Sequence, residues 1–266
     1  MSTVSEVITF LETLAPPELG EDWDNVGLLV GRRSAFVSKA MTCLTLTPDV
    51  ADEATANGVQ LIVSHHPVLF RGAKKITDAT SEGRMLLKLI ENGVAVFSPH
   101  TCFDSAALGV NQQLAESFEL EEIRPIRPNS DGSFVGSGRV GCLPVTISID
   151  EFLARVKEAV GATYLEFCAE PDATVSTVAV ACGAAGDFLS DAKKLGCDTF
   201  VTGETRFHSA LDARTSGLNL IVLGHYCSER PAVESLANVL QETFPGVDVV
   251  ASQVESDPLS KYPNEN

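Results

Sequence analysis

Short runs of β-branched and apolar residues alternate with amphipathic segments of helix length along most of this chain. In its first part the apolar runs are AMTCLTLT, LIVSHH and VAVFSPH, and the segments of helix length are PDVADEATANG, SEGRMLLKLIENG and DSAALGVNQQLAESF. This alternation predicts an α/β protein with open, mixed and mostly parallel sheets. At 266 residues, the chain is long enough for one large domain or for two interlocked halves.

The segment from residue 119 to 147 interrupts this alternation. It contains PIRPNSDGSFVGSGRVGCLP, whose Pro, Gly and Ser content predicts turns and short antiparallel strands. Ser148 and Glu151 then give a capping-box signature for a helix, and the alternation resumes as far as residue 254. We therefore predict two related α/β halves, residues 1–118 and 148–254, connected by residues 119–147. The polar tail, residues 255–266, is expected to be frayed or docked on a neighbour.

A weak internal repeat links the two predicted halves. Gly93 leads an apolar strand into His100 and then Asp104, and Gly217 leads another strand into His225 and then Glu229. One strand earlier in each half, LIVSHHP is echoed by TFVTGETRFH. The pattern indicates a duplicated α/β unit whose two sets of loops lie at the carboxyl ends of their strands, where open α/β sheets place ligands.

The charge of the chain disfavours nucleic acid as a partner, and its apolar pattern argues against a membrane span or a signal peptide. The formal net charge is −17, from 36 acidic and 19 basic residues, and this disfavours binding to a nucleic-acid backbone. No apolar run approaches the roughly 18 to 20 residues of a membrane span. The N-terminal segment carries Glu6 and Glu12 where a signal peptide needs a basic start and an apolar core. We therefore expect a cytoplasmic protein.

The seven cysteines are an odd number and include no C-x-x-C pair, which predicts reduced, buried thiols that pack as small apolar side chains. Cys102 and Cys227 differ, because both lie within histidine motifs and could line a site there.

Four of the five histidines lie at or just past the ends of predicted strands, in HHP, HTCFD and HYCSE. His65 and His66 would point to opposite faces of a regular strand, but at a strand end, before Pro67, each could reach a different metal ion. The His-x-x-x-Asp/Glu spacing places two ligands on one side of a first helical turn. Mixed nitrogen and oxygen ligation suits Zn, Fe, Mn or Co better than Ca or Mg.

Five such ligands exceed one tetrahedral site. They predict a pair of divalent transition-metal ions about 3.5 to 4 Å apart, with one carboxylate bridging and a water or hydroxide between the ions, an arrangement used for metal-assisted hydrolysis. We expect this centre to lie between the two halves. The five predicted ligands are His65, His66, Asp104, His225 and Glu229.

Each motif also has a simpler interpretation. His65 and His66 could be packing residues, and His100–Asp104 and His225–Glu229 could be hydrogen-bonded pairs; the matched repeat favours the metal interpretation. His208, inside a predicted helix, is either structural or a partner of a ligand. Asp24 and Asn25, in WDNVGLLVG, are interpreted as turn residues. The sequence contains neither a phosphate-cradling loop of known type nor a G-x-S-x-G nucleophile elbow.

Taken together, these motifs resemble the Nif-three-like dinuclear-metal family, many of whose bacterial members are called GTP cyclohydrolase 1 type 2 homologues. The resemblance rests on WDNVGLLVG, LIVSHHPVLFRGAKKI, HTCFD followed by GVN, GSGRVGCLP, VAVACGAAGDFL, TGETRFHSALDA, GLNLIVLGHYCSE and ESDPL. It implies the short family form, without an inserted domain, and a toroidal homohexamer whose metal centres face an internal cavity. It also implies that His65 and His66 each bind one ion, that Asp104 is a further ligand, that His225 binds the other ion, and that Glu229 bridges.

Two hypotheses for function follow. In the first, the protein is a metal-dependent hydrolase of a nucleotide such as GTP, with His100 or Glu204 as proton carrier; its obvious basic cluster is Arg71, Lys74 and Lys75. In the second, it is a non-catalytic metal-binding hexamer that acts as a regulator, metal carrier or interaction platform. A third, DNA binding by a ring-shaped assembly, is disfavoured by the acidic charge.

Overall fold

The computed structural model describes residues 2–129 and 135–260, which group into two compact units. Unit 1 consists of Met1–Thr9, Asn25–Ser98 and Val233–Asn266, and unit 2 consists of Phe10–Asp24 and Pro99–Ala232. The chain passes from one unit to the other four times: within helix α1 (Val4–Leu14), after Asp24, after Ser98, and within helix α9 (His225–Thr243). The units are therefore discontinuous in sequence, and the division at residues 118, 147 and 254 stays a prediction about the sequence pattern.

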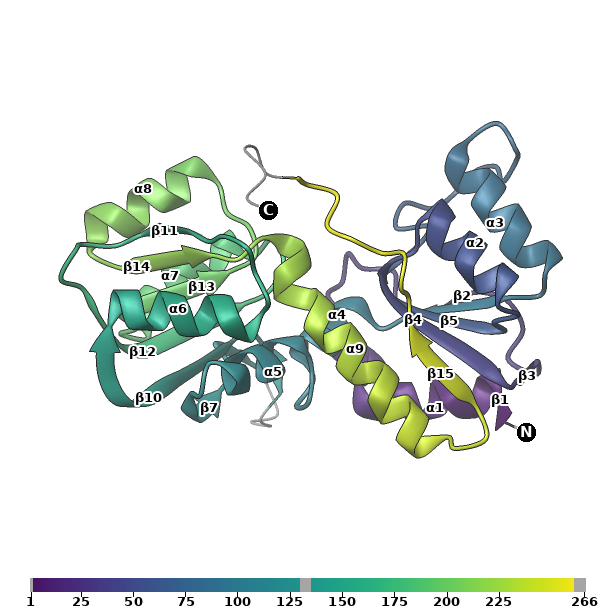
Figure 1. Cartoon of the computed structure of the whole chain (residues 1–266), viewed down its shortest axis with the longest axis horizontal. Helices are drawn as coiled ribbons and strands as arrows, with labels where there is room; N and C mark the ends of the chain where they lie inside the picture. Colours follow the sequence, from purple (N-terminus) through teal and green to yellow (C-terminus); the bar gives the residue numbers. More distant parts are fainter. Residues whose placement is uncertain (1, 130–134, 261–266) are drawn as a thin grey trace. The chain divides into compact units, whose positions relative to one another are not determined.

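Unit 1 is built on a five-stranded sheet with the strand order β15-β4-β5-β6-β2 (Figure 1). The first four strands in this order run parallel, and β2 is antiparallel to β6. Helices α2 and α3 lie between consecutive strands, as predicted, and each begins at a threonine N-cap, Thr47 or Thr80, whose hydroxyl accepts a backbone N–H. The elements are β2 (Gly27–Val30), β4 (Lys39–Thr45), α2 (Pro48–Ala56), β5 (Leu61–His66), α3 (Ser81–Glu91), β6 (Ala95–Ser98) and β15 (Asp248–Ala251), with the short pair β1 (Ser2–Thr3) and β3 (Phe36–Val37).

Unit 2 is built on a six-stranded sheet with the order β11-β14-β13-β12-β10-β7. Strands β12, β13 and β14 run parallel, whereas β11, β10 and β7 pair antiparallel to their neighbours. The elements are η1 (Pro17–Leu19), α4 (His100–Ser105), α5 (Val110–Ser117), β7 (Glu121–Arg124), β8 (Arg127–Pro128), β9 (Gly136–Ser137), β10 (Arg139–Ser148), α6 (Ile149–Ala159), β11 (Glu166–Cys168), β12 (Thr174–Ala181), η2 (Gly186–Phe188), α7 (Leu189–Lys194), β13 (Thr199–Thr202), α8 (Phe207–Ser216) and β14 (Asn219–Val222).

The mixed α/β class is confirmed, and both sheets share one pattern. Each has three successive parallel strands, β4-β5-β6 or β12-β13-β14, and the last of the three pairs with an antiparallel edge strand. This is the structural form of the repeat in the sequence. The sheet of unit 2 holds more antiparallel pairs than the prediction of mostly parallel sheets implies, because β7 and most of β10 come from the segment predicted to form antiparallel strands.

Each unit has its own apolar core. In unit 1 the core side chains of β4, β5 and β6 pack with those of α2 and α3, and include Met41, Ile62, Leu86, Leu89 and Val96. In unit 2, Ala179, Phe200 and Leu220 of the parallel strands pack against Leu189 and Ala213 from the helices. The predicted N-cap is confirmed, because the Ser148 hydroxyl accepts a hydrogen bond from Glu151 N at 3.2 Å.

The single helix predicted from residue 104 is instead two helices, α4 and α5, and the first begins earlier, at His100. Arg139, which is fully buried, donates from Nη2 to the carbonyl oxygens of Ala106 at 2.6 Å and Ser105 at 3.3 Å. These carbonyls are at the break, so a side chain from β10 satisfies backbone groups that a continuous helix would have paired internally. The prediction of one helix was wrong because the residue that stabilises the break is distant in sequence.

Among the described residues, none of the helices is both long enough and apolar enough to span a membrane.

The beginning of the polar tail is docked: the Glu255 carboxylate accepts hydrogen bonds from the backbone of β4. Residues 261–266 of the predicted tail lie outside the described residues.

Candidate metal centre

The start of helix α9 brings two predicted ligands into contact. Gly224, with φ of +87°, turns the chain from β14 into α9, whose first residue is His225. One turn later the buried Glu229 places Oε2 3.1 Å from His225 Nε2. On the other side of the ring, Glu204 Oε1 lies 3.6 Å from Nδ1. The hydrogen bond to Glu229, despite burial, raises the pKa of His225 to about 9. A divalent cation is attracted by the same carboxylates and competes with this proton for the imidazole.

Asp104, which is half-buried, adds a second carboxylate in unit 2. Burial first, and then the charge of Glu229, hold the pKa of Asp104 well above its usual range. Cys182 donates from Sγ to Asp104 Oδ1 at 3.2 Å. Asn111 donates to the Asp104 carbonyl at 3.1 Å and accepts from the Cys182 N–H at 2.8 Å, so it ties α4 to the end of β12. Two like charges this close, one buried and one half-buried, are unfavourable unless a proton or a cation neutralises them, and this donor set fits a metal ion.

Gly183 provides the space beside this pair of carboxylates. Its φ is +62°, and a Cβ atom built on it would lie 2.5 Å from Glu229 Oε1 and 3.5 Å from His225 Nε2. Its N–H donates to the Ser228 hydroxyl at 3.0 Å, and that hydroxyl donates to the His225 carbonyl at 2.7 Å. A side chain at position 183 would fill the space in which a cation could meet Glu229 and His225.

The carboxylate of Asp24 holds the ring of His100. Its Nδ1 lies 2.8 Å from both carboxylate oxygens of Asp24, and Asp24 also accepts from the Thr101 hydroxyl at 2.6 Å. Burial lowers the pKa of His100, but the hydrogen bond to Asp24 and the charges of Asp104 and Glu229 raise it above its ordinary value overall. Asp24 does close a turn, because its N–H donates to the Glu21 carbonyl at 2.9 Å, but its side chain contacts His100 and Thr101 instead of capping local backbone. The signal that could have found it is a carboxylate three residues before strand β2, in a chain that needs an acceptor for His100.

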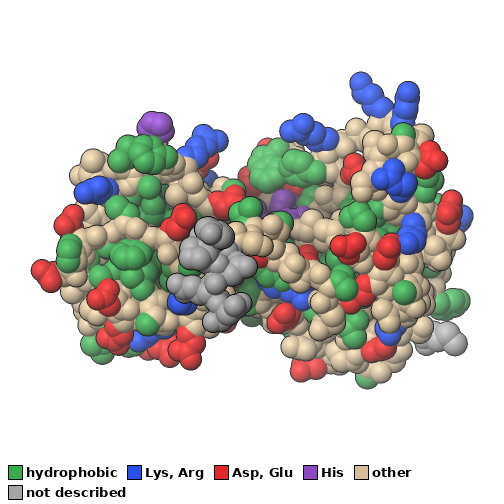
Figure 2. All heavy atoms as spheres, turned by 45° about the horizontal axis from the view of Figure 1, so that its top comes forward, with side chains coloured by type: hydrophobic (Ala, Val, Ile, Leu, Met, Phe, Trp, Pro, Cys, Tyr) green, Lys and Arg blue, Asp and Glu red, His purple; other side chains and the backbone are tan. Residues whose placement is uncertain are grey.

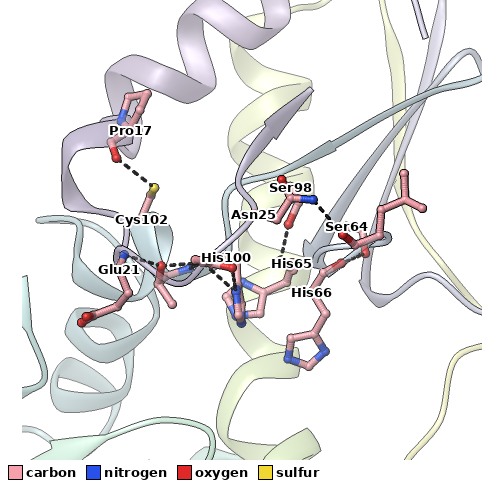
Figure 3. Close-up of polar contacts among 12 residues, drawn as sticks. Pro17, Glu21, Asn25, Ser64, His65, His66, Ser98, His100 and Cys102 are labelled. Atoms are coloured by element: carbon pink, nitrogen blue, oxygen red, sulfur yellow. Dashed lines mark hydrogen bonds and ion pairs between the residues drawn. The ribbon is translucent and has the colours of Figure 1, made fainter. Parts of the chain in front are cut away.

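His65 and His66 end strand β5 in unit 1 (Figure 3). The strand continues through His66, so the predicted break in geometry comes after the second histidine, at Pro67. The two ring centroids are 5.2 Å apart and the rings are inclined at 54°. The Ser98 hydroxyl donates to the His65 carbonyl at 2.7 Å, and the Thr45 hydroxyl lies 2.8 Å from His66 Nδ1. Strand backbone and neighbouring hydroxyls thus fix both histidines at the carboxyl end of β5.

Other residues considered from the sequence lie elsewhere. His208 is exposed on α8, where its ring meets that of Phe207 edge to face, and the structure gives it no contact with the predicted ligands. The Cys102 thiol donates to the Pro17 carbonyl at 3.7 Å (Figure 3), and burial raises its pKa to about 12. All seven cysteines are free thiols; Cys43, Cys102, Cys182 and Cys197 are buried and the others half-buried. Cys182, which was predicted to be only a packing residue, contacts the predicted ligand Asp104.

Among the described residues, the candidate metal ligands are His65 and His66 in unit 1 and His100, Asp104, His225 and Glu229 in unit 2. The family model for Duf34/NIF3 (NGG1p interacting factor 3) matches residues 2–258. The chain belongs to the DUF34/NIF3 family. This confirms the resemblance seen in the sequence motifs.

Relatives in this family match the chain over nearly its full length. The GTP cyclohydrolase 1 type 2 homolog of Clostridium perfringens is 33% identical over 257 residues, which cover 96% of this chain and 98% of that protein. The GTP cyclohydrolase 1 type 2 of Helicobacter pylori (strain 26695) is 33% identical over 244 residues, or 90% of this chain and 92% of that protein. The crystal structure of Staphylococcus aureus protein SA1388 superposes with a TM-score of 0.89 at 26% identity, covering 98% of this chain and 99% of that one.

Proposed function

We propose that the five predicted ligands, His65, His66, Asp104, His225 and Glu229, hold two divalent transition-metal ions, and that the protein uses this centre to hydrolyse a nucleotide such as GTP. The observation that carries the proposal is the pair of carboxylates in unit 2, the half-buried Asp104 and the buried Glu229, with His225 in contact with Glu229. Zn, Fe, Mn and Co all suit this mixture of imidazole and carboxylate.

The bound ions would supply Lewis acidity and lower the pKa of water. The side chains of this chain then have separate roles. Because His100 contacts Asp24 through Nδ1, Asp24 orients the ring, and proton transfer by His100 would use Nε2. Glu204 contacts His225 Nδ1, so it orients this ligand and is a second candidate for carrying a proton.

A nucleotide substrate also needs cations that face its phosphates. Residues 67–77 carry Arg71, Lys74 and Lys75 and no carboxylate, and these three side chains are exposed. Figure 2 shows several Lys and Arg side chains on the upper part of unit 1, with Asp and Glu side chains interspersed among them. The name of the Helicobacter pylori relative supports GTP as the first substrate to test.

The alternative is a non-catalytic metal-binding hexamer that acts as a regulator, metal carrier or interaction platform. The same ligands would serve it, and the 34% identical Schizosaccharomyces pombe relative, Protein NIF3 homolog, has a name that specifies no reaction. In both proposals the protein is a toroidal homohexamer. Light scattering should then give a mass of six 28.3 kDa chains.

Turnover separates the two functions. Metal-loaded protein would be assayed against GTP and a panel of nucleotides and phosphoesters, beside Glu229→Ala and the control Glu234→Ala, which removes an exposed carboxylate from the same helix. Hydrolysis that survives in the control and is lost in Glu229→Ala supports the enzyme. Absence of turnover in protein that retains its metal would rule out GTP hydrolysis and leave the non-catalytic role.

A further inference from the structure

The beginning of the C-terminal tail is fixed along β4 in unit 1. After β15, Ser252 N donates to the Thr42 carbonyl at 2.8 Å, and the Ser252 hydroxyl donates to Glu53 at 2.6 Å. The Glu255 carboxylate then accepts from Leu44 N at 2.8 Å and from Thr45 N at 2.5 Å. We call residues 252–255 the tail strap. Its bidentate carboxylate binds the last two N–H groups before β4 ends at Thr45.

Thr45 extends this contact to a predicted metal ligand. Thr45 and His66 are directly paired in the parallel register of β4 and β5. The Thr45 hydroxyl lies 2.8 Å from His66 Nδ1. A histidine that binds a metal through one ring nitrogen commonly gives the N–H of the other to an oxygen, which fixes its tautomer and orientation. Because Nδ1 of His66 contacts the Thr45 hydroxyl, His66 would coordinate a metal ion through Nε2.

We infer that Glu255 and Thr45 are positioning residues for His66, so that the tail strap is a functional part of the metal centre. This inference rests on the proposed metal binding. It gives a role to the ESDPL block, which begins at Glu255 and which the proposed chemistry leaves without one. Glu255 fixes the backbone of Thr45, and Thr45 fixes the ring of His66. Because coupling between two events is reciprocal, metal binding at His66 also stabilises the docked strap.

Zinc binding tests the inference in the full-length protein. Thr45→Val removes the hydroxyl, and Glu255→Ala removes both backbone contacts; Thr45→Ser keeps a hydroxyl and serves as the rescue. The controls are Thr55→Val, whose hydroxyl donates to carbonyls within α2, and Asp257→Ala, whose carboxylate accepts from Leu259 N within the tail. Loss of such a partner typically lowers metal affinity on the order of 10- to 100-fold. We expect a loss in this range for Thr45→Val, a loss in the same direction for Glu255→Ala, and near wild-type affinity for Thr45→Ser and both controls.

Hydrogen exchange of residues 252–259, with and without zinc, provides the second readout. Zinc should slow exchange in the strap of the wild-type protein and leave exchange unchanged in Thr45→Val. A contact that only stabilises the fold would not make exchange in the strap depend on zinc. If the wild type binds zinc, but Thr45→Val and Glu255→Ala bind it equally well and zinc does not protect the strap, the positioning role is wrong. If the wild type binds no zinc, the proposed metal centre fails first, so the two failures are distinct. Should Glu255→Ala not fold, Glu255→Gln and Thr45→Val still decide the question.

Discussion

Nδ1 of His100 lies 2.8 Å from both carboxylate oxygens of Asp24, a residue 76 positions earlier in the chain. This contact joins the first residue of α4 to the segment before β2, and it keeps the imidazole charged over a wider pH range. His100 has a φ of +25°, so its backbone also adopts a conformation that residues other than glycine rarely take. The side-chain contacts of Asp24 stabilise this conformation.

Replacing Asp24 with Asn should lower the pKa of His100, because the substitution removes a negative charge and keeps the shape of the side chain. Since the folded pKa is raised above its ordinary value of 6.5, protonation of His100 stabilises the fold. That stabilisation is complete below the unfolded pKa and is lost as the pH rises through the folded pKa. Histidine NMR titration of chelator-treated protein, with denaturation at several pH values, measures both effects. Asp22→Asn, at an exposed neighbour, should change neither; an unchanged His100 pKa in Asp24→Asn would contradict the assignment.

Gly183→Ala should remove metal binding as well as stability. A Cβ at this position would overlap Glu229 Oε1, and the φ of +62° is also unfavourable for alanine. Gly196→Ala is the matched control, because Gly196 has a φ of +76° but no atom within 4 Å of a built Cβ. Strain alone should destabilise both variants by about 1 kcal/mol. Denaturant unfolding and elemental analysis should show further destabilisation and lower metal content for Gly183→Ala alone; equal behaviour of the two variants would argue against a cation space beside Gly183.

The double variant Lys74→Ala/Lys75→Ala should weaken nucleotide binding without changing metal content. Removing the two lysine charges should weaken binding at low salt by roughly tenfold, on the basis of about 0.7 kcal/mol of interaction per exposed charge pair. Lys193→Ala/Lys194→Ala is the control with the same charge change, since these lysines pair with Asp212 and Asp191 in unit 2. Calorimetry with a non-hydrolysable GTP analogue at two ionic strengths measures the difference. Equal affinities for the two double variants would exclude the 67–77 loop as the phosphate contact.

Local pattern was enough to predict the ligand pair at the start of α9 and the ligands at the end of β5. His225 and Glu229 are one turn apart, so their contact follows from helical geometry alone, and His65–His66 is visible as a strand end. The helix N-cap at Ser148 is equally local. These features depend on neighbours in sequence, which periodicity and capping chemistry describe well.

Contacts between distant segments could not be predicted in this way. The pairing of β15 with β4 joins residues 248–251 to residues 39–42, and no local pattern encodes it. The break between α4 and α5 depends on Arg139, and the setting of His100 depends on Asp24. In each case a polar group is satisfied by a partner that only the folded chain brings near. The role of Gly183 is likewise invisible in the sequence, because it depends on the space next to Glu229.

Elemental analysis of protein purified without chelator tests the metal centre most directly. Two transition-metal ions per chain are expected in the wild type, with a reduced content in Glu229→Ala and no change in Glu234→Ala. Anomalous diffraction at the corresponding absorption edge would then place both ions at the five predicted ligands. One ion or none per chain in the wild type, or anomalous peaks away from Asp104, His225 and Glu229, would contradict a paired metal centre in this protein.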